Sequence, residues 1–205
     1  MLRKHLTLTL VISCFFALFS LNVYAQSAQT LFRQAGDPVV GDRNGSVTMV
    51  EFMDYQCSHC IEMAPVVESL IRNNPSLRVV YKLVGVRGPQ SEQAARAAIA
   101  ANLQGKFKAF NRALVNANQE LSDRVIFSLA KSSGLNVEKL KSDMNSASVD
   151  NVIKANMSLA SDLNIPGTPA FYFGKTNAAD LNSITSLIGA VNQRELQNAV
   201  NAGGQ

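Results

Sequence analysis

The chain has 205 residues, of which 47% are hydrophobic and 17% are charged, and its formal net charge is +4. This length excludes several large domains and the apolar fraction excludes a disordered chain, so we expect one domain with a modest insertion. Lys and Arg are not clustered along the chain, so we expect no nucleic acid among its partners.

Residues 1–25 have the pattern of a secretory signal peptide. A positively charged start at residues 3–5 is followed by a mostly apolar run over residues 6–21 and by Val-Tyr-Ala at residues 23–25, a small-residue cleavage pattern. We therefore predict cleavage after Ala25, export, and no stable membrane insertion afterwards. An uncleaved anchor is one alternative, although the apolar run is short for a membrane span. Lipidation of Cys14 is another, but the apolar run continues past that residue.

The rest of the chain alternates between strand and helix patterns. Residues 26–46 form a polar lead-in with no assigned element. A helix with one apolar face is predicted from Cys57 to residue 73, with a kink at Pro65, and a closing helix is predicted at residues 193–200. Strands are predicted where apolar residues run together between turn signals, at residues 47–53, 77–84, 170–173 and 186–189.

Residues 91–163 form an uninterrupted helical block. Its helices follow from apolar spacings of three and four, and polar residues are assigned as three of the N-terminal caps, namely Ser91, Ser122 and Asn136. The block separates two parts of a sheet, neither of which could form a complete sheet alone. We therefore predict an α/β core built from residues 26–90 and 164–205, with residues 91–163 as an all-helical insertion.

Cysteine usage is the most informative feature of the sequence. Without the leader, the chain keeps two cysteines and one histidine, and all three lie in the motif Cys57-Ser58-His59-Cys60, which follows a buried strand and opens a helix. A zinc half-site is one interpretation, but a closed zinc site needs four ligands, and the chain has no second pair. A structural disulfide is another, but so short a loop would stabilise the fold weakly.

A redox-active dithiol fits the position of the motif best. Cys57 lies at a helix N-terminus, where free amide groups and the helix dipole stabilise a thiolate and so lower the pKa of the thiol. Cys60 lies one turn further along and should be more buried. We expect Cys57 to be the attacking thiolate, Cys60 to be the resolving thiol, and a cationic His59 to favour the thiolate further. No cofactor and no metal is expected for this chemistry.

These residues resemble a known family, the DsbA-like thiol:disulfide oxidoreductases of the bacterial periplasm, which have the thioredoxin fold. The motif at residues 57–60 shares the internal histidine of the family's usual Cys-Pro-His-Cys, and Pro65 falls where thioredoxin-like proteins kink the active-site helix. Glu51 matches the buried acid that the family carries beneath the disulfide. Gly-Thr-Pro at residues 167–169 is similar to the family's cis-proline loop. The resemblance covers residues 40–201.

The resemblance implies a role for each of these residues. Glu51 would accept and deliver a proton at Cys60, although a glutamate that reaches solvent from an edge strand is the alternative, and Lys82 is a candidate ion-pair partner for it. Pro169 would follow a cis peptide bond, with an ordinary trans proline as the alternative, and the Thr168 backbone would hydrogen-bond an extended substrate strand. The helical insertion would help to frame a groove for unfolded polypeptide. Three methionines would be either adaptable contacts in that groove or core filler: Met53, Met63 and Met157.

Three features depart from the family pattern. Ser58 replaces the common proline between the cysteines, which leaves the oxidising strength of the pair open. Thr168 stands where many strong oxidases carry valine, and it resembles the isomerases of the same superfamily there. The chain has no Trp, so Tyr55 or Phe52 would take the place of the aromatic side chain near the site.

The sequence therefore predicts a periplasmic thiol:disulfide oxidoreductase that introduces disulfide bonds into exported proteins. Its expected partners are reduced or unfolded exported proteins and a membrane protein similar to DsbB, which would reoxidise it with a quinone. The lead-in is too short for the N-terminal dimerisation domain of DsbC- and DsbG-like isomerases, so we expect a monomer. An isomerase or reductase with the same site is the alternative activity. A secreted chaperone-like module that binds unfolded polypeptides is the alternative from another class.

Overall fold

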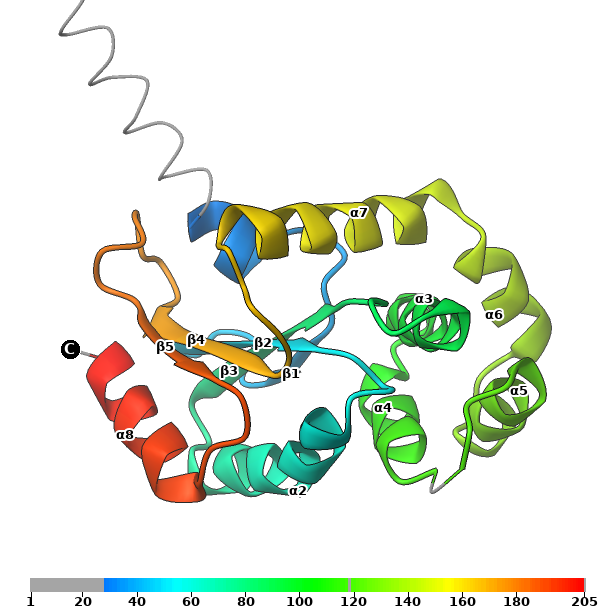
Figure 1. Cartoon of the computed structure of the whole chain (residues 1–205), viewed down its shortest axis with the longest axis horizontal. Helices are drawn as coiled ribbons and strands as arrows, with labels where there is room; N and C mark the ends of the chain where they lie inside the picture. Colours follow the sequence, from blue (N-terminus) through cyan, green and yellow to red (C-terminus); the bar gives the residue numbers. More distant parts are fainter. Residues whose placement is uncertain (1–27, 118, 205) are drawn as a thin grey trace, which may run out of the picture.

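The computed structural model describes residues 28–117 and 119–204, so the predicted signal peptide and the predicted cleavage site lie outside the described residues. At the centre of the molecule is a five-stranded sheet with the strand order β1-β3-β2-β4-β5 (Figure 1). β2 and β3 run parallel, and the other neighbouring pairs are antiparallel. The strands span Val39–Gly41 (β1), Val47–Met53 (β2), Leu77–Leu83 (β3), Ala170–Lys175 (β4) and Thr185–Ile188 (β5).

The central strand β2 is buried on both of its faces. All of its residues after Val47 are buried, and it is paired with β3 along its whole length. Successive side chains of a strand point to opposite faces of the sheet. Glu51 and its neighbour Tyr81 therefore share one face, whereas Phe52 and its neighbour Lys82 share the other. This alternation decides which side chains reach each side of the sheet.

Helices cover both faces of the sheet (Figure 1). α2 (Ser58–Asn73) and α8 (Gln193–Gly203) lie on one face, whereas α7 (Ala147–Asp162) and a helical segment at residues 28–33 lie on the other. α2 continues through Pro65. α8 begins with a capping box, in which the side chains of Asn192 and Glu195 each accept a hydrogen bond from the other's backbone N–H.

The helical insertion lies between β3 and β4 and consists of α7 and four shorter helices. Those are α3 (Pro89–Leu103), α4 (Phe107–Val115), α5 (Asp123–Ser132) and α6 (Val137–Met144). α3 lies at its centre and contacts all the others, since its buried alanines allow neighbouring helices to approach closely. One hydrophobic core joins the insertion to α2 and the sheet. Within the described ranges, no helix has both the length and the apolar character to cross a membrane.

The predicted α/β core with an all-helical insertion is confirmed, but several local predictions are corrected. The lead-in carries two elements that were not assigned, β1 and the helical segment at residues 28–33. α3 begins at Pro89 after Gly88, so Ser91 lies inside the helix and does not cap it. Proline suits the first turn because its missing N–H has no partner there in any case. Ser122 occupies the N-cap position of α5 without a side-chain hydrogen bond, whereas Asn136 caps α6 as predicted.

Lys82 does not pair with Glu51, because the two side chains point to opposite faces of the sheet. Instead its Nζ lies 2.5 Å from Oδ2 of Asp37 and donates to the carbonyl oxygen of Thr30 at 2.7 Å, and both charged side chains are buried. Burial raises the pKa of Asp37 to about 6, although the Lys82 charge and hydrogen bond oppose the rise. This ion pair ties the lead-in to the central sheet.

We expect Lys82→Met to lower the free energy of unfolding by about 3 kcal/mol, because the variant leaves the Asp37 carboxyl buried without its partner. The double variant Asp37→Leu/Lys82→Met should recover most of this loss, since no charge then remains buried. Urea unfolding at pH 7, followed by circular dichroism, measures both changes. Additive losses in the double variant would contradict this account of the pair.

Candidate active site

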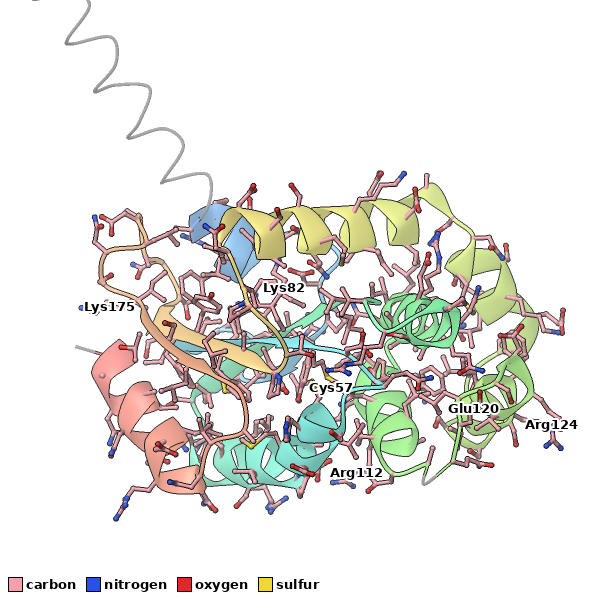
Figure 2. All side chains as sticks on the ribbon, viewed as in Figure 1. Cys57, Lys82, Arg112, Glu120, Arg124 and Lys175 are labelled. Atoms are coloured by element: carbon pink, nitrogen blue, oxygen red, sulfur yellow. The ribbon has the colours of Figure 1, made fainter. Side chains whose placement is uncertain are left out.

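The two cysteines lie at the N-terminal end of α2, just beyond the end of β2. Figure 2 shows Cys57 at the end of the sheet that faces the helical insertion. Cys57 is the N-cap residue of α2, and both cysteines are free thiols and fully buried. Ser58 and His59, between them, are exposed. The motif therefore presents its polar residues to solvent and its sulfur atoms to the protein.

The pKa of the Cys57 thiol is lowered. Burial alone would raise it, but several interactions together outweigh burial: hydrogen bonds with the Thr168 side chain and with the backbone and thiol of Cys60, and the positive charge of Arg87. The hydrogen bond with the Cys60 backbone expresses the preference of helix N-termini for negative charge. Cys57 is therefore the more easily ionised of the two thiols, as its place at the start of the helix led us to expect.

The pKa of the Cys60 thiol moves in the opposite direction. Burial raises it well above its ordinary range, and the neighbouring Cys57 sulfur raises it further. The thiolate form is thus favoured at Cys57 and the thiol form at Cys60. Thiol–disulfide exchange uses such a difference, because the thiolate is the attacking species.

Glu51 lies beneath the cysteines on the face of β2 that carries α2. Its side chain is in the central strand and is buried, so the alternative of an edge-strand glutamate that reaches solvent is wrong. Burial raises the pKa of its carboxyl to about 8. The carboxyl is therefore protonated at neutral pH. Glu51 and Cys60 line the same small cavity, of about 10 Å³, together with Tyr81 and Asn111.

The loop before β4 brings Thr168 and Pro169 against the cysteines. The peptide bond between these two residues is cis, so the trans alternative is wrong. The Cys57 thiol donates a hydrogen bond to the carbonyl oxygen of Thr168 at 3.2 Å. The two segments that the sequence analysis singled out, on either side of the helical insertion, therefore meet at the sulfur of Cys57.

His59 is exposed to solvent and contacts Glu62. Its side chain is 61% exposed, and its Nδ1 lies 3.2 Å from Oε2 of Glu62. The arginine whose charge acts on Cys57 is Arg87, in the loop after β3. A contribution of His59 to the thiolate stays a prediction. Within residues 28–117 and 119–204, no three His, Cys, Asp or Glu side chains come together as a metal site would require.

Asp54, between β2 and α2, was not identified from the sequence. Its carboxylate is fully buried and accepts three hydrogen bonds, from the backbone N–H of Gln56 at 2.7 Å, the backbone N–H of Val86 at 2.9 Å and the hydroxyl of Ser91 at 2.5 Å. An aspartate directly after a buried strand and three positions before Cys57 was the available signal. Arg87 had none, because it lies in a different loop with no pattern around it.

The aromatic and methionine candidates divide between the two faces of the sheet. The Tyr55 hydroxyl donates to Oδ1 of Asn111 at 2.6 Å and so ties the loop before Cys57 to α4. Phe52 lies on the opposite face of β2 and packs against Tyr172. Met53 and Met63 are buried core residues, whereas Met157 is 39% exposed. Of the three methionines, only Met157 has the exposure that a peptide contact needs.

Comparisons with known proteins agree with this fold. A family model described as the DSBA-like thioredoxin domain matches residues 48–201. The thiol:disulfide interchange protein DsbA of Bordetella parapertussis is 28% identical over 162 residues, which are 77% of each chain. The Na⁺/H⁺ antiporter NhaA 3 of Salinispora tropica is 28% identical over 138 residues, which are 66% of this chain and 21% of the antiporter. The chain thus spans about a fifth of the length of that relative.

A solved structure agrees with most of the fold. A thioredoxin-like oxidoreductase of Silicibacter pomeroyi is 36% identical and superposes with a TM-score of 0.76, over 84% of this chain and 95% of that one. The fold is thus thioredoxin-like, with α3–α7 inserted between β3 and β4. The extent of the family match and of this superposition shows that the chain belongs to the DSBA-like thioredoxin domain family.

Proposed function

We propose that the protein is a thiol:disulfide oxidoreductase that introduces disulfide bonds into exported proteins. The proposal rests on one observation: the pKa values of the two thiols in the motif shift in opposite directions, down at Cys57 and up at Cys60. A stabilised Cys57 thiolate favours the reduced form of the motif, which makes its disulfide a stronger oxidant. The family membership and the name of the Bordetella relative, a thiol:disulfide interchange protein, support the same chemistry.

In the proposed reaction, a substrate thiolate attacks the Cys57 sulfur of a Cys57–Cys60 disulfide. The disulfide bond breaks, a mixed disulfide forms between the substrate and Cys57, and Cys60 leaves as a thiolate. Glu51 delivers its proton to Cys60 across the cavity that both line. A second substrate thiolate then attacks the substrate sulfur of the mixed disulfide and releases Cys57 as a thiolate. Two electrons thereby pass from the substrate dithiol to the protein.

The proposed setting follows from the same family resemblance. The predicted signal peptide would direct the chain to the periplasm, where reduced exported proteins are the substrates. The Thr168 backbone, next to the Cys57 sulfur, would hydrogen-bond an extended substrate strand. A membrane protein similar to DsbB, with its quinone, would reoxidise the cysteine pair. The protein would act as a monomer, with no cofactor of its own.

The equilibrium reduction potential of the cysteine pair tests the direction of the reaction. We expect a reduction potential well above that of the cellular glutathione pool. The measurement is sensitive, because about 30 mV corresponds to about 1.4 kcal/mol for a two-electron couple. The chain from residue 26 is titrated against glutathione buffers, and the disulfide fraction is read by thiol alkylation and mass spectrometry. A thioredoxin-like potential would overturn the oxidase in favour of a reductase. A pair that never exchanges would leave only a structural disulfide.

Single cysteine variants test the roles of the two sulfurs. We expect Cys57→Ser to abolish thiol exchange, because the Cys60 thiol is buried and resists ionisation. Cys60→Ser should retain the reactive sulfur and accumulate a stable mixed disulfide with a disulfide-containing peptide. Non-reducing electrophoresis with mass spectrometry detects the trapped species. A chaperone-like module predicts instead that both variants act as the unaltered protein does.

The variant Glu51→Gln tests the raised pKa of the buried carboxyl through the free energy of unfolding. Because the folded pKa of about 8 lies above the ordinary value of 4.5, the stabilising effect of the proton is complete below pH 4.5 and is lost as the pH rises through 8. The unaltered protein should lose on the order of 4 kcal/mol in free energy of unfolding over this range through Glu51. We expect Glu51→Gln to remove that pH dependence, measured by urea unfolding of the reduced protein between pH 4 and 9.

The same variant tests proton delivery. Below pH 8, Glu51→Gln should slow reduction of the disulfide form by dithiothreitol by at least about tenfold, because an amide is too weak an acid to protonate the Cys60 thiolate. The difference should shrink above pH 8, where the Glu51 carboxyl has ionised. An unchanged pH–rate profile would show that Glu51 has no part in proton transfer.

A further inference from the structure

A pocket of about 450 Å³ opens between α7 and the loops that precede α3 and β4. Most of the residues that line it are apolar, including Phe52, Val84, Ile165 and Pro166. Two other apolar residues of its wall are open to solvent, Val86 at 54% and Met157 at 39% exposure. An apolar surface left exposed beside a complete core is typical of a binding site.

The pocket adjoins Cys57 through Thr168. Thr168 lines the pocket, and its carbonyl oxygen accepts the hydrogen bond from the Cys57 thiol. Arg87 also lines it, and the charge of Arg87 acts on Cys57. Because Cys57 is fully buried, a polypeptide that brings its own sulfur to Cys57 has to lie along the neighbouring surface. The pocket is part of that surface.

Arg87 gives the pocket its electrostatic character. Among the described residues that line the pocket, it alone carries a charge. Arg87 is exposed, and in the described part of the chain no carboxylate forms an ion pair with it. Arg96 and Arg112, in contrast, are paired with acidic side chains of the protein. A cation without such a partner beside an apolar wall is complementary to a carboxylate that accompanies an apolar side chain.

We propose that this pocket selects the substrate: it takes an apolar side chain from the segment that flanks the reacting cysteine, and Arg87 pairs with a carboxylate in the same segment. The inference rests on the proposed function. The occupant is an extended, reduced polypeptide that carries an apolar and an acidic residue within a few positions of its cysteine. Segments with a basic residue at that place are disfavoured.

A cycle of variants and peptides tests the role of Arg87. The peptides have a single cysteine and are otherwise identical in sequence, except that they carry Asp or Asn two positions before or two positions after the cysteine. Their rates of reaction with the disulfide form are measured for the unaltered protein and for Arg87→Gln. The cycle cancels the effect of Arg87 on Cys57, because that effect is common to both peptides. In at least one position, the Asp/Asn rate ratio should be about two- to fivefold higher in the unaltered protein, and high salt should reduce this difference. Equal ratios in both proteins at both positions would overturn the role of Arg87.

A second series tests the apolar wall against a matched surface position. Met157→Ser and Val86→Ser should lower the preference for a peptide with Leu over one with Ala by about threefold or more, because the variants remove apolar contact area. Leu103→Ser is the control, since Leu103 is 44% exposed and lies outside the pocket. It should leave the preference unchanged. If all three variants lose the preference for the Leu peptide equally, or if none of them loses it, the pocket is not the binding site.

Dithiothreitol, a small neutral dithiol, separates the two proposals. Each peptide rate is divided by the rate with dithiothreitol for the same variant. If the unaltered protein reacts with dithiothreitol but shows no preference among peptides, the selectivity proposal fails and the oxidoreductase stands. If the disulfide of the unaltered protein reacts neither with dithiothreitol nor with any peptide, the proposed function itself fails.

Discussion

The three hydrogen bonds that Asp54 accepts hold the candidate site together. A buried carboxylate is costly unless donors surround it, and here the donors come from the turn before Cys57, from the loop after β3 and from the first turn of α3. Val86, one of these donors, is the residue before Arg87. Asp54 therefore ties the turn before Cys57 to the loop that carries Arg87, and it joins the helical insertion to the end of β2.

β2 serves two purposes because its side chains alternate between two faces. Glu51 points toward α2 and lines the cavity beneath Cys60, whereas Phe52, the next residue, points to the other side and lines the pocket beside Thr168. One strand thus separates the proposed route of the proton from the proposed surface for the substrate. Both faces stay fixed, because β2 is paired on both edges and cannot shift its register without exposing its buried side chains.

The sequence predicted the elements and residues whose signals are local. β2 is found with the predicted bounds, α2 begins next to Cys57, and the cis-proline loop lies where the resemblance implied. β1 was missed because three residues within a polar lead-in carry too little pattern. The hydrogen bond of Ser91 to Asp54, the partner of Lys82 and the effect of Arg87 could not be predicted, because each depends on a contact between segments far apart in the chain.

The pairing of Lys82 with Asp37 has a consequence for the site as well as for the fold. A lysine beside Glu51 would stabilise the carboxylate and lower its pKa, so that Glu51 would be ionised at neutral pH. Because Lys82 lies on the other face, the pKa of Glu51 stays near 8 and its carboxyl keeps a proton. In the proposed exchange, Cys60 leaves as a buried thiolate whose pKa is raised, and it needs a proton at once. A neutral acid across a shared cavity can supply that proton, whereas an ion-paired carboxylate could not.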